Sequence, residues 1–375
     1  MLAGTLFKEM KNRPNILDEY DKAKMLAAKG RTVFTSPEDT LILEDDTGRI
    51  RLTNPEDRIV LDIQRLVSGP VIAVRGRVLE SGVFVVNECC FKDVPEQQAL
   101  PHRADAAGGA RFVCLVSGLH IGDASADATP QQLFADFVSG FLGAGEEVKT
   151  AASIVQVIIA GNALSAIDDT SDASSAADKA KTRRDGAPSR ATRPLAELDM
   201  LLTQLCASVP VLLMPGDSDP SNFTMPQQPL HACMFKNAAT FSTFHSTTNP
   251  CDAHLDGVHI MGTSGQNIED IAKYSVCDDR LQCLENTLRW GHLAPTAPDT
   301  LPCYPFSADE PFVLPSAPHI LFAGNQASFA TKLVEGAEGQ RVRLVLVPTF
   351  ATTHSVVLVN IDTLECEAVH FGVPS

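Results

Sequence analysis

VPVLLMPGDSD, residues 209–219, is a short apolar run that ends abruptly in a glycine and two aspartates. Such a run predicts a strand buried on both faces, followed by a loop at the carboxyl end of that strand. Similar apolar runs occur on both sides of it along the chain. They are RFVCLVSG (111–118), IVQVIIAGN (154–162), VHIMGTSG (258–265), HILFAGN (319–325), VRLVLVP (342–348) and SVVLVNI (355–361).

Helical patterns lie between some of these strand-like runs. Leucines recur on one helical stripe in residues 195–207, and again in residues 278–290. Alternation of strands and helices predicts a layered α/β domain over residues 104–375. Residues 166–193 are polar, small and without period, so we expect an exposed, disordered loop there. Its basic segment KAKTRRD could bind acidic partners, although a solvated loop is the preferred interpretation.

The N-terminal residues 1–103 have a different pattern, with short strands and no helical period. GTLFKEM, DTLILEDDTGRIRL, GPVIAVRGRVLESG and VFVVNECCF alternate or run apolar and are separated by turn residues. Strands of this length, interrupted by Gly, Asp and Pro, predict a small all-β barrel. Residues 94–110 are rich in proline and small residues, and we interpret them as the linker to the second domain.

Charge is distributed unevenly between these two parts. Residues 1–103 carry 15 basic and 16 acidic side chains, whereas residues 104–375 carry 15 basic and 30 acidic ones. A surface that neutralises phosphates is basic, so the acidic second domain is not expected to bind DNA directly. No apolar run is long enough to span a membrane, and the first residues do not have the pattern of a secretory signal.

Common catalytic and metal-binding motifs are missing from the sequence. The ten cysteines form no CxxC pair, so we expect reduced, mostly buried thiols and no zinc site built from them. The sequence contains neither GxxxxGK[ST] nor GxSxG. GTSGQN (262–267) is rich in glycine and could bind phosphate, although a structural turn before a helix is the preferred interpretation.

Polar loops follow the apolar runs, at the strand ends where ligands gather in open α/β sheets. The loops SGLHIG, IIAGN, MPGDSDP, GHLAP and FAGN resemble in spacing those of the calcineurin-like metallophosphoesterases. In that family the loops carry Asp, Asn and His ligands for two metal ions that activate water. The corresponding positions here are Ser117, Leu119, Asn162, Asp217, Ser218, His292, Asn325 and Ala327.

Serine, leucine and alanine cannot hold a pair of divalent ions, so the resemblance implies a phosphoesterase fold without catalytic residues, metal or other cofactor. One alternative remains open. His120 lies one residue beyond the expected histidine position and Asp123 follows it, so an active metallophosphoesterase could use His120, Asp123, Asp217 and His292. Asp217 and Asp219 also suit a simpler role as turn-capping residues.

Longer strings resemble a more specific family, the B subunits of the replicative DNA polymerases alpha, delta and epsilon, with the delta branch the most similar. The resemblance covers nearly the whole chain outside residues 166–193. It is carried by VPVLLMPGDSDPSNFTMPQQPLHACMF, DGVHIMGTSGQNIEDI, APTAPDTLPCYPF, HILFAGNQASF, GTLFKEM, LEDDTGRI and VSGPVIAVRGRV. Relatives in that family have more chain before GTLF, so we expect the barrel here to lack its first residues.

This resemblance implies an OB-fold barrel followed by an inactive, calcineurin-like phosphoesterase β-sandwich with flanking helices. It also implies a nuclear scaffold in DNA replication and repair. The expected partners are the cysteine-rich C-terminal domain of the catalytic subunit, the third polymerase subunit and the catalytic subunit of a translesion polymerase. DNA is then contacted only indirectly. Two exposed aromatic candidates for partner binding are Phe223 and Tyr304, which lie in strings rich in proline and poor in charge.

A third hypothesis is that the barrel itself binds single-stranded DNA. OB folds do so with a basic groove and stacked aromatic side chains. The near-zero charge of residues 1–103 and their few aromatic residues argue against this hypothesis. Those aromatic residues are Phe7, Tyr20, Phe34, Phe84 and Phe91.

Overall fold

The computed structural model of this protein describes residues 1–13, 33–101, 109–123, 128–166, 192–307 and 309–372. The chain forms two compact units, and each is built from several stretches of sequence. The barrel unit comprises Met1–Gln98, Gln266–Ala317 and Val334–Arg341, and the sandwich unit comprises Ala99–Gly265, Pro318–Leu333 and Val342–Ser375. The boundary between residues 103 and 104 stays a prediction. Most of the predicted loop 166–193, including its basic segment, lies outside the described residues.

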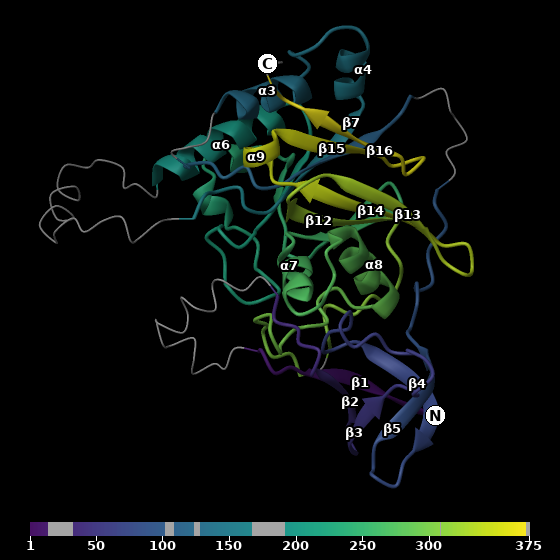
Figure 1. Cartoon of the computed structure of the whole chain (residues 1–375). Helices are drawn as coiled ribbons and strands as arrows, with labels where there is room; N and C mark the ends of the chain where they lie inside the picture. The colour runs from purple at the N-terminus through teal and green to yellow at the C-terminus, as the bar shows by residue number, and fades with distance from the viewer. Residues whose placement is uncertain (14–32, 102–108, 124–127, 167–191, 308, 373–375) are drawn as a thin grey trace, which may run out of the picture. The chain divides into compact units, whose positions relative to one another are not determined.

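Five strands close the barrel in the order β1-β2-β3-β5-β4 (Figure 1). They are β1 (Leu2–Glu9), β2 (Thr40–Asp45), β3 (Gly48–Thr53), β4 (Val71–Val78) and β5 (Phe84–Cys90). The barrel interior is filled by alternate side chains of these strands, because successive residues of a strand point to opposite faces. The buried ones include Leu6, Leu41, Leu43, Leu52, Ile72, Val74 and Val86. The predicted OB-fold barrel is confirmed.

One of the inward-facing side chains of β1 is a lysine. The Lys8 ammonium is buried and donates hydrogen bonds of 3.0 Å to the carbonyl oxygens of Leu66 and Tyr274. Its Nζ lies 3.8 Å from the buried carboxylate of Asp39. Burial lowers the pKa of Lys8 to about 8, against the opposing effect of Asp39. These acceptors stabilise a cation that would otherwise be costly to bury.

Two helices far along the sequence belong to the same unit as the barrel strands: α7 (Gln266–Lys273) and α8 (Arg280–Trp290). The segment between them contacts residues that follow β1 and precede β4. Tyr274 stacks on Phe34 with ring centroids 5.4 Å apart, and the amide of Val276 donates to the carbonyl of Gln64. The barrel strands and α7–α8 therefore share one packed unit.

The sandwich unit contains two sheets, apart from the last residues of β13 and the first of β14 (Figure 1). The six-stranded sheet has the order β16-β15-β6-β7-β8-β9, and the five-stranded sheet has the order β10-β11-β12-β14-β13. The first sheet consists of β16 (Cys366–His370), β15 (Ser355–Asn360), β6 (Phe112–Val116), β7 (Ile154–Ala160), β8 (Val211–Met214) and β9 (Phe244–Ser246). The second consists of β10 (Cys251–Leu255), β11 (Val258–Thr263), β12 (Ile320–Gln326), β14 (Arg341–Pro348) and β13 (Ala330–Glu335).

The central strands are apolar throughout because both of their faces are covered. In β6, Val113 and Leu115 join a core with residues of the five-stranded sheet such as Phe322 and Val345. Cys114 and Val116 point the other way, into a core shared with the flanking helices. Those helices are α3 (Thr129–Val138), α4 (Glu146–Ala152), α6 (Thr192–Cys206) and α9 (Phe350–Thr353). Sheets with flanking helices are thus confirmed, in the sandwich arrangement that the resemblance implied.

Within the described residues, every helix is too short or too polar to cross a membrane. All ten cysteines are free, and four of them are buried: Cys114, Cys206, Cys251 and Cys283. The expectation that most thiols are buried is therefore wrong. Cys89 and Cys90 lie at the end of β5, and Cys233 and Cys303 lie outside the named strands; of these four, Cys90 and Cys233 are exposed and Cys89 and Cys303 are partly buried.

Candidate functional site

Ser117 links the end of β6 to the ends of two other strands. Its Oγ accepts a hydrogen bond of 2.8 Å from the amide of Asn325, at the end of β12. The same hydroxyl lies 3.1 Å from the carbonyl oxygen of Pro348, the last residue of β14, to which it donates. The side chain is fully buried. The position that the resemblance assigned to a metal ligand thus holds a hydroxyl bonded to the main chain.

Asn162, which follows β7, connects the neighbouring loops in the same way. Its Oδ1 accepts a hydrogen bond of 3.2 Å from the amide of Ser218, and its carbonyl accepts one of 3.1 Å from the amide of His120. His120, Asn162 and Asn325 all have left-handed backbone, with φ of 46°, 53° and 56°. Such conformations in residues other than glycine are uncommon and cluster at functional sites.

Asp219 anchors the loop after β8, whereas its neighbour Asp217 is exposed. The buried Asp219 carboxylate accepts hydrogen bonds from the amides of Gly216 (2.8 Å), Leu164 (2.9 Å) and Ala163 (3.3 Å). Burial raises the pKa of Asp219, although these hydrogen bonds oppose the shift. The turn-capping role that the sequence suggested is confirmed for Asp219.

Other predicted positions lie elsewhere in the two units. Leu119 is fully buried in the core beneath the flanking helices, and Ala327 is exposed. The side-chain amide of Asn325 donates to the carbonyl of Ser264 at 2.8 Å, while its Oδ1 is buried without a hydrogen-bond partner among the described residues. The structure therefore brings together Ser117, Asn162, Ser218 and Asn325, and it points Leu119 into the core.

His292 belongs to the barrel unit, just after α8. Its Nδ1 accepts a hydrogen bond of 3.2 Å from the amide of Ala294, and its ring contacts Phe312. Burial lowers the pKa of His292 to about 4, so the imidazole is neutral near pH 7. Of the other residues in the alternative hypothesis, His120 is partly buried and its carbonyl accepts a hydrogen bond from the amide of Asp123.

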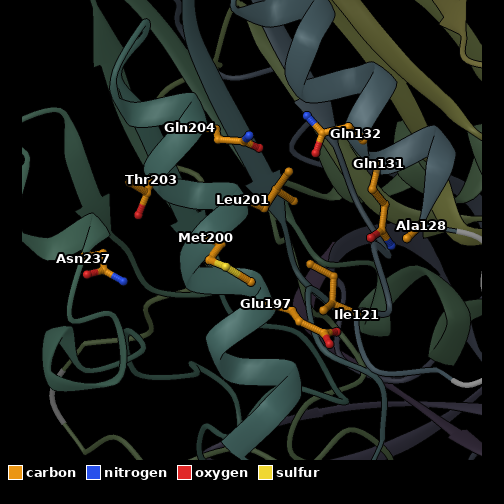
Figure 2. A pocket seen from close by; sticks show the side chains of 10 residues that line it. All are labelled: Ile121, Ala128, Gln131, Gln132, Glu197, Met200, Leu201, Thr203, Gln204 and Asn237. Atoms are coloured by element: carbon orange, nitrogen blue, oxygen red, sulfur yellow. The ribbon is translucent and has the colours of Figure 1, made fainter.

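A surface groove of about 530 Å³ lies between α3 and α6 (Figure 2). Amide side chains and apolar ones share its lining, and Glu197 is the ionisable residue among them. Gln131 is fixed there by a hydrogen bond of 2.9 Å to the carbonyl of Leu119. Sequence reasoning had not singled out this groove, since its α6 lining (Glu197, Met200, Leu201, Thr203 and Gln204) lies beside the leucine stripe and not on it.

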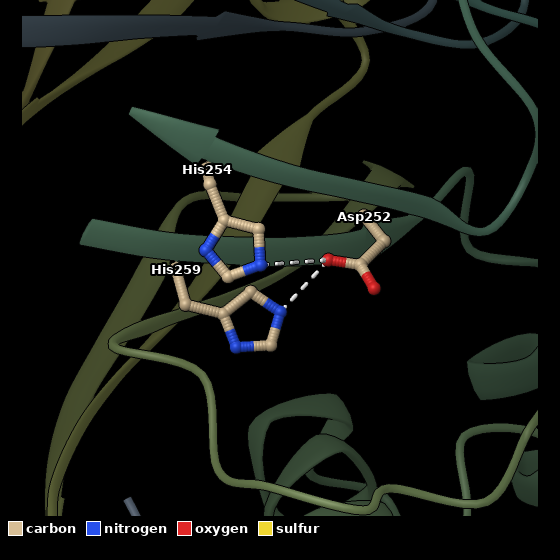
Figure 3. Close-up of side chains that lie close together, drawn as sticks. All are labelled: Asp252, His254 and His259. Atoms are coloured by element: carbon tan, nitrogen blue, oxygen red, sulfur yellow. Dashed lines mark hydrogen bonds and ion pairs between the residues drawn. The ribbon is translucent and has the colours of Figure 1, made fainter. Parts of the chain in front are cut away.

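A cluster that sequence reasoning missed lies on β10 and β11. Asp252, His254 and His259 bring a carboxylate and two imidazoles within 4.8 Å of one another (Figure 3). A signal was present: His254 and His259 flank Asp256-Gly257, a residue pair typical of hairpin turns. The hairpin places the two histidines opposite each other, and Asp252 two residues before His254.

The two predicted partner-binding residues are both accessible. Phe223 is 74% exposed and Tyr304 is 59% exposed. The loop that carries Phe223 is held by Asn222, whose Oδ1 accepts from the amide of Gln228 and whose Nδ2 donates to the carbonyl of Pro226. Tyr304 contacts Phe306 edge to face, with centroids 4.9 Å apart. Their role in binding stays a prediction.

Two family models match this chain. The family model for the B-subunit of DNA polymerase alpha/epsilon matches residues 113–331, and the model for the OB-fold domain of the DNA polymerase delta subunit matches residues 1–89. The DNA polymerase delta small subunit of Oryza sativa subsp. japonica is 41% identical over 373 residues, which are 99% of this chain and 83% of that protein. The chain belongs to the DNA polymerase delta small-subunit family.

Other members of the small-subunit family are similar over the same extent. The small subunit of Arabidopsis thaliana is 41% identical and covers 99% of this chain, which matches 82% of that protein. DNA polymerase delta subunit 2 of Drosophila melanogaster is 39% identical over the whole chain and 83% of its own length. The family named from the sequence is thereby confirmed.

Proposed function

We propose that this chain is a non-catalytic scaffold subunit of DNA polymerase delta in the nucleus. It joins the cysteine-rich C-terminal domain of the catalytic subunit to the third subunit, and it serves a translesion polymerase through the same mode of binding. Membership of the small-subunit family supports the assignment to this polymerase. The acidic character of residues 104–375 supports a protein partner rather than DNA there.

The observation that carries the proposal is the hydrogen bonding of the strand-end loops. Ser117 Oγ, Asn162 Oδ1 and the Asp219 carboxylate are all engaged with main-chain groups of the chain itself. A working two-metal hydrolase would instead hold Asp, Asn and His side chains ready to coordinate the ions. The loops thus act as structural links between strands, which supports an inactive phosphoesterase fold.

The aromatic residues of the barrel support an indirect relation to DNA. Phe84 is buried, Phe34 stacks on Tyr274, and Phe91 lies 6.3 Å from Trp290 between ring centroids. The Phe7 ring has the Arg49 guanidinium over its face, and Tyr20 lies outside the described residues. Aromatic side chains engaged in internal contacts are not free to stack on bases.

Partner binding is tested with Phe223→Ala and Tyr304→Ala. The two side chains are exposed and aromatic, as the anchors of protein interfaces often are, so each truncation is expected to weaken binding by about 2 kcal/mol or more. Affinity for the purified C-terminal domain of the catalytic subunit is measured by calorimetry. Phe141→Ala is the matched control, because Phe141 is 86% exposed and lies outside both strings.

Thermal unfolding of each variant checks that the fold is intact. Unchanged affinity in both folded variants would refute these two anchors while leaving the scaffold role in place. Failure of the wild-type chain to bind the catalytic subunit's domain at all would refute the scaffold role itself.

One alternative function is favoured by the left-handed backbone at His120, Asn162 and Asn325, since such conformations gather at active sites. It is an active metallophosphoesterase that uses His120, Asp123, Asp217 and His292. Hydrolysis of a generic phosphodiester with added Mn²⁺, lost in Asp217→Ala and His292→Ala, would favour this alternative. We expect no such hydrolysis.

A further inference from the structure

The turn between β10 and β11 fixes which side chains face each other on this hairpin. Asp256 and Gly257 form a two-residue loop with φ of 49° and 83°, as a type I′ turn requires. The resulting register pairs Leu255 with Val258 and His254 with His259. Because side chains alternate along a strand, Asp252 lies on the same face as His254.

The opposite face of the hairpin is committed to the core. Cys251 and Val258 are buried in the core between the two sheets, with Ala253 and Leu255 packed against it. On the other face the side chains of Asp252 and His254 are 58% and 61% exposed, while that of His259 is 9% exposed. β10 is an edge strand of its sheet. An ion can therefore reach the Asp252 and His254 side chains from solvent.

The imidazoles are arranged so that one atom of each points to the same carboxylate oxygen (Figure 3). Asp252 Oδ1 lies 2.8 Å from Nε2 of His259 and 4.0 Å from Nε2 of His254. The two rings are stacked nearly parallel, with centroids 4.4 Å apart. Tetrahedral zinc, with bonds near 2.1 Å, separates its ligand atoms by about 3.4 Å, and the two observed distances bracket this value.

We propose that Asp252, His254 and His259 bind one divalent transition-metal ion, with Zn²⁺ as the ion that fits best. Two imidazole nitrogens and one carboxylate oxygen form a ligand set that zinc favours, and water completes the tetrahedron. The carboxylate offsets part of the charge of the ion.

The main chain beneath the site is well fixed. The amide of His259 donates to Nδ1 of His319 at 2.9 Å, and the amide of His319 donates to the carbonyl of His259 at 2.8 Å. All three ligands are carried by strands whose register is set, and His259 is further fixed by its bonds to His319. Rotation of the Asp252 and His254 side chains would close the site around the ion.

Zn²⁺ itself is the probe. The full chain, stripped with EDTA and dialysed, is titrated with Zn²⁺ by calorimetry, and bound zinc is counted by elemental analysis. We expect one ion per chain at this site, with affinity reduced at least about tenfold in His254→Ala and in Asp252→Asn, since loss of even an outer partner costs that much. His245→Ala is the matched control, because His245 is exposed on β9, in the other sheet.

Co²⁺ substitution distinguishes this site from binding at the ten free thiols. Nitrogen and oxygen ligation gives no thiolate-to-cobalt charge-transfer band, and zinc should raise the melting temperature of the wild type but not of His254→Ala. Unfolding in EDTA checks that the variants fold. The proposal is overturned if wild type, His254→Ala and Asp252→Asn bind zinc equally well, if none binds it, or if the bound cobalt shows thiolate ligation.

Discussion

At the scale of single residues, His292 shows how burial couples a side chain to pH. Its pKa is lowered from 6.5 to about 4 in the folded protein, while in the unfolded chain it returns to its ordinary value. Between these two values the unfolded state binds more protons than the folded state. Protonation of His292 in the unfolded chain therefore lowers the free energy of unfolding as the pH falls from 6.5 toward 4. Above pH 6.5 the imidazole is neutral in both states, and this loss is absent.

We predict that His292→Asn removes this dependence, because the amide oxygen of asparagine can still accept the hydrogen bond from Ala294 but does not titrate. Urea unfolding at pH 7 and at pH 4.5 measures the free energy of unfolding of both proteins. Between these two pH values the free energy of unfolding of the wild type should fall by about 2 kcal/mol more than that of the variant. Equal losses in the two proteins would show that the buried imidazole does not resist protonation.

The Asp252, His254 and His259 cluster also belongs to the scale of single residues. It could not be predicted from the three residues taken one at a time. None of the three stands in a known metal-binding motif of the sequence. Their proximity depends on the register of one hairpin, which a shift of a single residue would destroy. Spacing along the chain could identify such a set only after Asp256-Gly257 had been taken as a two-residue turn.

At the scale of elements, Asp219 connects the loops that follow β7 and β8. Its carboxylate satisfies three buried amides that have no place in either strand's ladder. We predict that Asp219→Asn lowers the free energy of unfolding by about 2 kcal/mol or more, since an amide NH₂ cannot accept these bonds. Denaturant unfolding monitored by circular dichroism measures the change.

Asp217→Asn supplies the control for this prediction. Asp217 is two residues away and exposed, so its substitution should change stability by no more than about 0.5 kcal/mol. Similar effects of the two substitutions would mean that net charge, and not the buried hydrogen bonds, determines the stability of this loop.

Most strands and both leucine-striped helices could be predicted from the sequence, because burial on two faces or one stripe leaves a local pattern. RFVCLVSG and IVQVIIAGN became β6 and β7, and the leucines of α6 face the core. The strand-end loops could be located as well. What those loops do could not be predicted locally, since Leu119 turns into the core while Ser117 bonds to residues more than 200 positions away.

At the scale of the whole molecule, the barrel unit combines the first 98 residues with two later stretches. Ring contacts and hydrogen bonds join them, including Phe91 with Trp290 and Asp93 with Arg289 at 2.7 Å. No composition shift or linker marks this arrangement, because α7 and α8 alternate with strands in the same way as the helices of the sandwich unit do. The sequence pattern alone therefore predicts a single domain boundary, near residue 103.

We predict that a fragment of residues 104–375 does not fold stably by itself. It retains α7 and α8 but lacks the barrel residues that cover their apolar side chains, so those side chains should be exposed. Binding of a hydrophobic dye would detect the exposed apolar side chains, and loss of a cooperative melting transition would show that the fragment is not stably folded. Co-expression with residues 1–103 should restore both properties. Full cooperative stability of the fragment alone would establish the boundary near residue 103 as that of an independent domain.

The buried ammonium of Lys8 has a consequence for the time course of synthesis. One of its acceptors, the carbonyl of Tyr274, is 266 residues further along the chain. At a synthesis rate of about 5–20 residues per second, that carbonyl leaves the ribosome's catalytic centre roughly 13 to 53 seconds after the lysine. During this interval the nascent barrel carries a cation whose final acceptor has not yet been made. Strand β1 is therefore made well before its side chain at Lys8 can reach its finished hydrogen bonding.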